Sequence, residues 1–398
     1  MKKSLFALML GGFGIGTTEF VMMGILPDIA YSLGISIPQA GHLISAYALG
    51  VVVGAPLLVM MAHRFTPKTI LMALMLMFTL FNGLCIVAPN YKSLFLFRFL
   101  SGLPHGAFFG VGAVVAQRLA DKGKEAQAMS MMYLGLTLAN LLGVPLGTFL
   151  GHNVSWRYAF ILVATTGALT WLSLRLWMPF LPKDNPHNLR TQLGFFFRKE
   201  AWLIMWATAI GTGGFFCWYS YIAPLLTEVS GFSPSHVPYI MALAGAGMCI
   251  GNLVGGKLAD RYSHAKLCAL FLAGMMASLL SVYFLAEYRA VMLASTFITG
   301  TLVMMLSAPI QMLMIQTAKG AETLASATLQ ACFNIGNALG AFLGGLPLVA
   351  GYSYASPQLV GVIMAALGIM AIAVLLRLNK KTTLNQKQNS AMQQNNKA

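Results

Sequence analysis

The sequence predicts an all-α membrane protein with twelve transmembrane helices, arranged as two parallel six-helix repeats. Three observations lead to this fold class: the composition, the number of long apolar runs, and an internal match between the two halves of the chain. The chain has 398 residues, of which 58% are hydrophobic and 9% are charged. Soluble domains carry about 25% charged residues. This chain therefore lacks the polar residues that would cover a water-soluble globule of its size.

A membrane-spanning helix needs about 20 consecutive apolar residues, and the sequence contains twelve runs of about that length. The first run resembles a signal peptide, but it has no A-x-A cleavage site and continues to about residue 30, so we expect a retained first span. The runs cover residues 4–30, 41–62, 69–89, 93–118, 126–150, 157–179, 201–226, 236–258, 266–286, 290–317, 323–350 and 358–378.

The two halves match each other without gaps at an offset of 197 residues. Many matched residues are Gly, Pro or polar, so shared hydrophobicity does not explain the match. Examples are Gly16/Gly213, Pro27/Pro224, Gly34/Gly231, Gly50/Gly247, Asn140/Asn337, Gly143/Gly340 and Gly147/Gly344. Both halves begin on the same side of the membrane, so the repeats are parallel and related by an axis along the membrane normal. This arrangement is typical of alternating-access transporters.

The repeat divides the chain into four segments. We expect an N-terminal six-helix bundle at 1–180, a cytoplasmic central loop at 181–200 and a C-terminal six-helix bundle at 201–378. The Gln- and Asn-rich remainder, 379–398, is expected to be a disordered cytoplasmic tail.

The distribution of basic residues predicts the orientation. Twenty of the 25 Lys and Arg residues lie in the segments that are cytoplasmic if the N-terminus is cytoplasmic. Both termini are therefore expected inside the cell. The net charge of +15 is explained by these topology signals, so nucleic acid is not an expected partner. The five Cys residues are dispersed without a metal-ligand spacing, and no metal site is expected.

Glu19 is the only acidic residue near the middle of a predicted span. A charged side chain at that depth costs at least about 2.5–3.5 kcal/mol on insertion scales, so it is a functional-site hypothesis by default. Burial favours the protonated form of a carboxyl group. A carboxyl group that is exposed alternately to the two sides could bind a proton or a substrate in turn. A structural hydrogen bond, or a place in the lining of a pore, is the alternative interpretation.

Four other polar residues lie within predicted spans and are candidates for proton coupling or substrate contact. Arg98 either contacts Glu19 or an anionic group, or extends to the outer interface. His105 either titrates in the physiological range or is a neutral, hydrogen-bonded ring. Asn140 and Asn337, which the repeat matches, either contact substrate or bond between helices.

Glycines recur at four-residue spacing in several spans, which lets helix backbones approach closely. In the fifth span, Gly143 and Gly147 flank Pro145, and proline inside a helix removes a hydrogen bond and bends the chain. We expect this cluster to be a gating element, with static packing as the alternative. The loop after the eighth span contains Gly256, Asp260 and Arg261, which would pair with neighbouring charges or form a simple stop-transfer cluster.

Several of these motifs resemble a known family. Residues 256–266 resemble the cytoplasmic loop signature of the major facilitator superfamily, and 98–102 resemble its R-x-x-x-G motif. The Gly143-x-Pro145-x-Gly147 cluster resembles the fifth-span signature of its antiporters. Residues 14–20, 27–30 and 47–50 look like the drug:proton antiporter branch, and residues 50–57, 101–111, 139–148 and 155–160 look like AraJ-type efflux permeases.

The resemblance implies the major facilitator fold, a location in the cell inner membrane, and secondary efflux driven by inward proton movement. It implies no bound cofactor, because the proton gradient supplies the energy. It would place a gate-stabilising pair on Asp260 and Arg261. The equivalent first-half loop departs from the motif before Arg64, where His63 replaces Asp and Val59 replaces Gly. The first-half pairing is therefore in doubt.

We thus expect a proton-coupled efflux carrier for a small sugar- or drug-like solute, monomeric in the lipid bilayer. An uptake symporter and an uncoupled facilitator are the alternatives. A membrane-embedded enzyme is a remote alternative, because the sequence has no H-E-x-x-H, no G-x-S-x-G and no clustered acid pair. A channel fits the duplication poorly, and no phosphate-binding loop for ATP is present.

Overall fold

A computed structural model describes residues 3–62, 65–121, 125–182, 194–259, 261–318 and 322–395. These residues contain helices and short connections, with no strand among them. Twelve helical segments of the described chain are long and apolar enough to cross a membrane. The structure therefore confirms the all-helical fold class and the twelve predicted spans.

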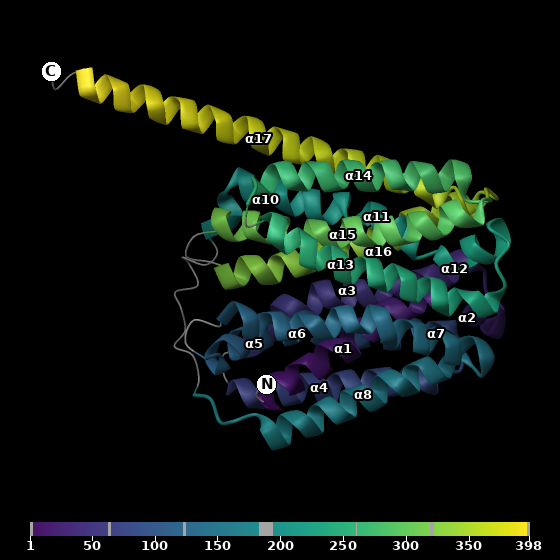
Figure 1. The fold of residues 1–398 in the computed structure, drawn as a ribbon. Coiled ribbons are helices and arrows are strands. Elements are labelled where there is room, and N and C mark those ends of the chain that lie inside the picture. Colours follow the sequence, from purple (N-terminus) through teal and green to yellow (C-terminus); the bar gives the residue numbers. More distant parts are fainter. Residues whose placement is uncertain are drawn as a thin grey trace.

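The first half consists of six spans. They are α1 (Lys3–Gly24) with α2 (Leu26–Leu33), α3 (Ile37–Ala62), α4 (Pro67–Ile86), α5 (Tyr91–Leu119), α6 (Glu125–Leu138) continued by the π-helix η1 (Ala139–Gly143) and α7 (Val144–Asn153), and α8 (Trp156–Trp177). In Figure 1 these elements, purple to teal, form the lower half of the bundle.

The second half repeats this arrangement in the upper part of Figure 1. A short helix η2 (Gly194–Phe197) precedes it. The six spans are α10 (Lys199–Trp206) with η3 (Ala207–Gly211), α11 (Gly213–Tyr219), α12 (Ile222–Pro224) and η4 (Leu225–Val229); η5 (Pro234–His236) with α13 (Val237–Ala259); α14 (His264–Leu285); α15 (Arg289–Thr317); α16 (Glu322–Val349); and α17 (Pro357–Asn395).

The duplication is visible in the backbone. The first span breaks at Ile25, two residues before Pro27, and the seventh span breaks between α11 and α12, before Pro224. Each break is followed by a glycine at positive φ, Gly34 at 62° and Gly231 at 66°, a conformation that glycine adopts without steric cost. Each proline and each glycine is matched at the offset of 197 residues, so the same residue types shape the backbone at equivalent places in both halves.

Four spans differ from the expected runs. The first and seventh spans are not continuous helices, because a proline near each break removes a backbone hydrogen bond. The fifth span contains the π-helical segment η1 directly before α7, and Pro145 lies in the first turn of α7. Finally, α17 continues to Asn395, where a disordered tail from 379 was expected. The stretch after residue 378 contains no Gly or Pro that would end a helix.

The two halves meet along an interface that we call the seam, and two helix crossings form much of it. In the first, α3 packs against α16, and Ser45 Oγ donates a hydrogen bond of 2.9 Å to the carbonyl oxygen of Ala338. In the second, α13 packs against η1 and α7. We call the end of the bundle that holds α2, α12 and the end of α7 the α2 end, at the right of Figure 1.

Close approach of helices within a half predicts a stability difference between two glycine variants. A Cβ at Gly102 of α5 would collide with the backbone carbonyl of Tyr47 on α3, whereas a Cβ at Gly83 of α4 meets nothing within 4 Å. We expect Gly102→Ala to destabilise the protein by about 1–3 kcal/mol, as overpacking does, and to lower its melting temperature in detergent. Gly83→Ala is the matched control and should not lower it. Equal melting temperatures for the two variants would contradict this helix packing.

Candidate transport site

Glu19 lies on α1 at the seam and is 6% exposed. Its carboxyl group is next to the side-chain amide of Asn337 on α16, and the guanidinium of Arg98 on α5 acts on it electrostatically without forming an ion pair. Asn337 belongs to the second half, so both halves contribute to the surroundings of this carboxyl group. Among the described residues the amide oxygen of Asn337 has no hydrogen-bond partner, which leaves acceptor capacity at this position.

Arg98 is fully buried in the first half. Its Nη1 donates to Thr18 Oγ1 at 3.0 Å, and Thr18 Oγ1 donates in turn to Asn82 Oδ1 at 2.6 Å. The guanidinium lies 4.4 Å from the centre of the Tyr47 ring, within range of a cation–π interaction. Its Nε and Nη2 have no hydrogen-bond partner. The side chain therefore stays inside the bundle and does not extend to the interface.

His105 joins the same network through Tyr47. The Tyr47 hydroxyl and His105 Nδ1 are 3.0 Å apart, and both side chains are buried. Tyr47 thus contacts His105 through its hydroxyl group and Arg98 through its ring face. Sequence reasoning missed Tyr47, Thr18 and Asn82, because it searched for charged groups and these three are uncharged. A hydroxyl or amide group in the middle of an apolar run was the available signal.

Asn140 lies elsewhere on the seam. Its Nδ2 donates to the carbonyl oxygen of Leu136 at 3.1 Å, and its Oδ1 is buried without a partner. Its backbone carbonyl faces Gly245 of α13, at the second crossing. The structure therefore brings Glu19, Arg98, His105 and Asn337 into one region and places Asn140 at a separate contact between the halves.

The predicted gating glycines form the surface on which α1 lies. Gly143, Gly147 and Gly151 recur every four residues and face side chains of α1 and of its break, also four residues apart: Thr17, Val21 and Ile25. Added Cβ atoms on this glycine face would collide with those side chains. The helix that carries Glu19 is therefore held at close range along η1 and α7.

The predicted loop cluster is only partly within the described residues. Gly256 has open space at its Cβ position, and Arg261 is exposed beyond the end of α13. Asp260 and Arg64 lie outside the described residues.

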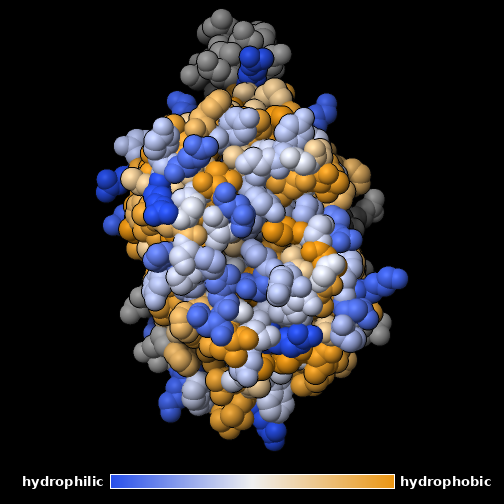
Figure 2. Space-filling view, turned by 90° about the vertical axis from the view of Figure 1, so that its right-hand side faces the viewer, coloured by the Kyte–Doolittle hydropathy of each residue, from blue (hydrophilic) through white to orange (hydrophobic). Residues whose placement is uncertain are grey.

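Aromatic side chains fill the seam between Glu19 and the α2 end. Phe20 stacks on Phe216 with ring centroids 6.4 Å apart and meets the edge of Tyr219 at 6.0 Å. The Tyr221 hydroxyl donates to the carbonyl oxygen of Ala341 at 2.6 Å and lies close to Gly41 of the first half. Figure 2 looks onto this end and shows a continuous surface, with polar side chains over its centre.

Comparisons with known proteins agree with this architecture. A family model described as Major Facilitator Superfamily matches residues 8–323. The chain is 42% identical over 354 residues to AraJ of Escherichia coli (strain K12), a protein named as a transporter, covering 89% of this chain and 90% of the relative. It is 39% identical over 378 residues to the inner membrane transport protein YdhP of Escherichia coli (strain K12), covering 95% and 97%.

Two solved structures have the same fold. One is a bacterial homologue of the human lysosomal transporter Spinster in an inward-facing and occupied conformation, with a TM-score of 0.74, 17% identity, and coverage of 94% of this chain and 96% of that one. The other is a mutant of the nucleoside transporter NupG, with a TM-score of 0.76, 12% identity, and coverage of 94% and 98%.

The fold and the buried site between two halves define a multi-pass secondary transporter of the inner membrane, and not an enzyme. The chain belongs to the Major Facilitator Superfamily. Its substrate is a small molecule, and the bilayer is its surrounding medium.

The double role of Tyr47 predicts a graded loss of stability. Tyr47→Phe removes the hydrogen bond to His105 and should cost about 1 kcal/mol. Tyr47→Leu also removes the aromatic face next to Arg98 and should cost roughly a further 1–2 kcal/mol. Thermal unfolding of the purified protein should rank wild type above Tyr47→Phe and Tyr47→Phe above Tyr47→Leu. A Leu variant as stable as the Phe variant would show that the contact with the guanidinium contributes nothing.

Proposed function

We propose that this chain is a proton-coupled efflux carrier of the drug:proton antiporter branch, which exports a small sugar- or drug-like solute while protons move inward. Both termini lie in the cytoplasm, and the protein acts as a monomer. The observation that carries the proposal is Glu19, a buried acid that both halves touch. When the two halves move relative to each other, the side of the membrane from which the Glu19 carboxyl group is accessible changes.

The exchange uses one proton site and one solute site that compete. A proton from outside binds a carboxylate oxygen of Glu19, and the neutral side chain is stable in the closed seam because burial disfavours the charged form. When the site opens inward, the O–H bond breaks and the proton leaves to the cytoplasm. The carboxylate is then free to accept hydrogen bonds from a solute. Solute and proton exclude each other, so they move in opposite directions.

The polar and aromatic groups near Glu19 support recognition of an amphipathic solute. Asn337 offers an amide oxygen without a partner, and within the described chain the buried hydroxyl of Tyr219 is also unpartnered. The Phe20–Phe216 stack supplies an apolar surface beside them. A solute with hydroxyl or amide groups on one side and an apolar face on the other matches this set. Sugars, nucleosides and many drugs share this chemistry, and one structural relative is named as a nucleoside transporter.

The fifth span supplies the gating element in this proposal. Pro145 follows the π-helical η1, so the hydrogen bonding of the helix is already irregular at that point. Because Gly143 and Gly147 carry no side chains, α1 tilts along this face without having to pass side chains at these two positions. The second gating element of the proposal is the loop motif that contains Gly256, Asp260 and Arg261, together with Arg64 of the equivalent first-half loop.

Replacing Glu19 separates coupling from transport. We expect Glu19→Gln to abolish proton movement coupled to the solute, because the amide binds no proton, while exchange of solute against solute persists. The measurement uses liposomes with a trapped pH-sensitive dye, an imposed proton gradient, and a panel of sugars, nucleosides and lipophilic cations added singly. Glu228→Gln, at an exposed acid on η4, is the matched control.

Three outcomes of this assay are distinct. Proton movement against one solute in wild type and in Glu228→Gln, but not in Glu19→Gln, supports the antiporter. Proton-coupled transport that is unaltered in Glu19→Gln would refute the role of Glu19. Solutes that equilibrate equally in all variants without proton movement would identify an uncoupled facilitator.

A further inference from the structure

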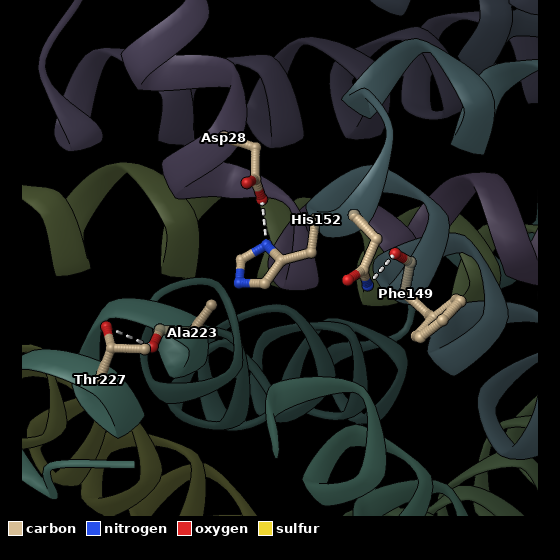
Figure 3. Close-up of polar contacts among 6 residues, drawn as sticks. Asp28, Phe149, His152, Ala223 and Thr227 are labelled. Carbon is tan, nitrogen blue, oxygen red and sulfur yellow. Dashed lines mark hydrogen bonds and ion pairs between the residues drawn. The ribbon is translucent and has the colours of Figure 1, made fainter. Parts of the chain in front are cut away.

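A His–Asp pair lies at the α2 end, outside the network around Glu19. His152 Nδ1 and Asp28 Oδ2 are 2.8 Å apart, and the two side chains are 14% and 23% exposed. Asp28 lies in the first turn of α2, and His152 lies in the last turn of α7. A negative charge near a helix N-terminus and a positive charge near a helix C-terminus are each favoured by the helix dipole. Figure 3 shows the imidazole between Asp28 and the ribbon that carries Ala223 and Thr227.

One residue, Ile25, separates α2 from the helix that precedes it. The first span breaks at Ile25, and α2 is an eight-residue helix that ends at Gly34, whose φ of 62° turns the chain. This short helix packs on α3 of its own half and also on α12 of the other half. The packing of α2 therefore joins it to both halves. The pair with His152 joins α2 to α7 of its own half.

The glycine face of α7 contacts α1 up to the break at Ile25. Gly147 faces Val21, Thr148 lies against Gly24, and Gly151 faces Ile25. His152 then reaches Asp28, one residue further along α7. The pair therefore completes a continuous contact between α7 and the first span, and it adds a polar link where the apolar packing ends.

The duplication argues that this pair is not needed to build the fold. At the offset of 197 residues, the positions of Asp28 and His152 correspond to Leu225 and Val349 in the second half. Leu225 is buried and Val349 is 72% exposed, so neither position forms a polar contact of this kind. One half thus holds a titratable link at a place where the other half folds without one.

We propose that the Asp28–His152 pair is a proton-responsive clasp that fixes α2 to α7, so that α2 separates from α12 together with the first half. The inference rests on the proposed function, because it assigns a positioning role in the opening step of that carrier. Imidazole is the side chain that ordinarily changes charge between pH 5 and 8. A carboxylate attracts the imidazolium more strongly than the neutral ring, so acid tightens the clasp and alkali loosens it. A higher proton concentration at the α2 end therefore favours the state in which α2 moves together with α7.

Other titratable groups near the clasp are engaged elsewhere or exposed. Arg157 of α8 donates through Nε and Nη2 to the carbonyl oxygens of Ile86 and Ala88, and it stacks on Trp156. The remaining titratable groups on α2 and on the elements that pack against α2 and α7 are Lys3 and Glu19 of α1, Tyr31 of α2, His42 and Tyr47 of α3, Tyr158 and Arg175 of α8, His236 of η5, and Tyr239, Cys249 and Lys257 of α13. Glu228 lies on η4, which follows α12. Within the described chain none of them forms an ion pair with Asp28 or His152.

The test measures the α2–α7 distance directly, without a transported solute. Spin labels replace Tyr31, which is 93% exposed on α2, and Val154, which is 60% exposed after α7, in full-length protein whose five cysteines are substituted. Pulsed electron paramagnetic resonance in lipid then gives the distance distribution at pH 5 and pH 8, the range over which imidazole titrates. We expect a narrow distribution at pH 5 that broadens at pH 8.

Three variants separate a titrating clasp from a structural contact. His152→Leu should give the broad distribution at both pH values, and His152→Gln, which keeps a neutral donor, should lose the pH response. His236→Gln, at an exposed histidine of η5, is the matched control and should keep it. A wild-type distribution that does not change with pH, or a pH response that survives in His152→Leu, would overturn the proposal. The dye assay on Glu19→Gln is independent of these results, so failure of the clasp and failure of the antiporter are distinguishable.

Discussion

The burial of one guanidinium in the first half is the constraint on which the rest of the site depends. An ion inside a low-dielectric bundle is tolerated only where polar groups and other charges surround it. Arg98 meets this requirement in part, through Thr18, which is itself bonded to Asn82, and through the ring of Tyr47. Its Nε and Nη2 have no hydrogen-bond partner among the described residues. Thr18 and its neighbour Glu19 point to different sides of α1, because successive helical residues are about 100° apart. The same helix therefore contacts the buried cation with one residue and presents a carboxyl group at the seam with the next.

The duplication makes this asymmetry visible. In the second half, Phe216 stands at the position of Glu19 and Ser295 at the position of Arg98. The second half therefore has the same helical frame without the charges, and it contributes aromatic packing and Asn337 to the site. Close packing along the glycine faces is common to both halves, since Gly340 and Gly344 lie against α11 as Gly143 and Gly147 lie against α1. The helical frame is thus duplicated, whereas the two charged groups, Glu19 and Arg98, belong to the first half alone.

Composition, hydropathy and the offset match were sufficient to predict the fold, because span length and repeat symmetry are properties of the sequence itself. The burial of Glu19 and Arg98 was also predictable, because each is a charged residue within a long apolar run. The contacts of Tyr47 and the link from Asp28 to His152 were not, because they join residues 58 and 124 positions apart and depend on which helices are neighbours. The breaks at Ile25 and after Tyr219 follow from prolines that are visible in the sequence, although apolar runs alone do not show where a helix ends.

Competition between proton and solute for Glu19 is the central claim, and infrared difference spectroscopy tests it most directly. The protein in lipid is measured with and without the solute that the liposome panel identifies, and the spectrum of Glu19→Gln is subtracted to assign the carboxyl band. The account predicts that the band of the protonated Glu19 carboxyl group decreases when the solute binds. A band that is unchanged at saturating solute would mean that proton and solute bind independently, which contradicts the account.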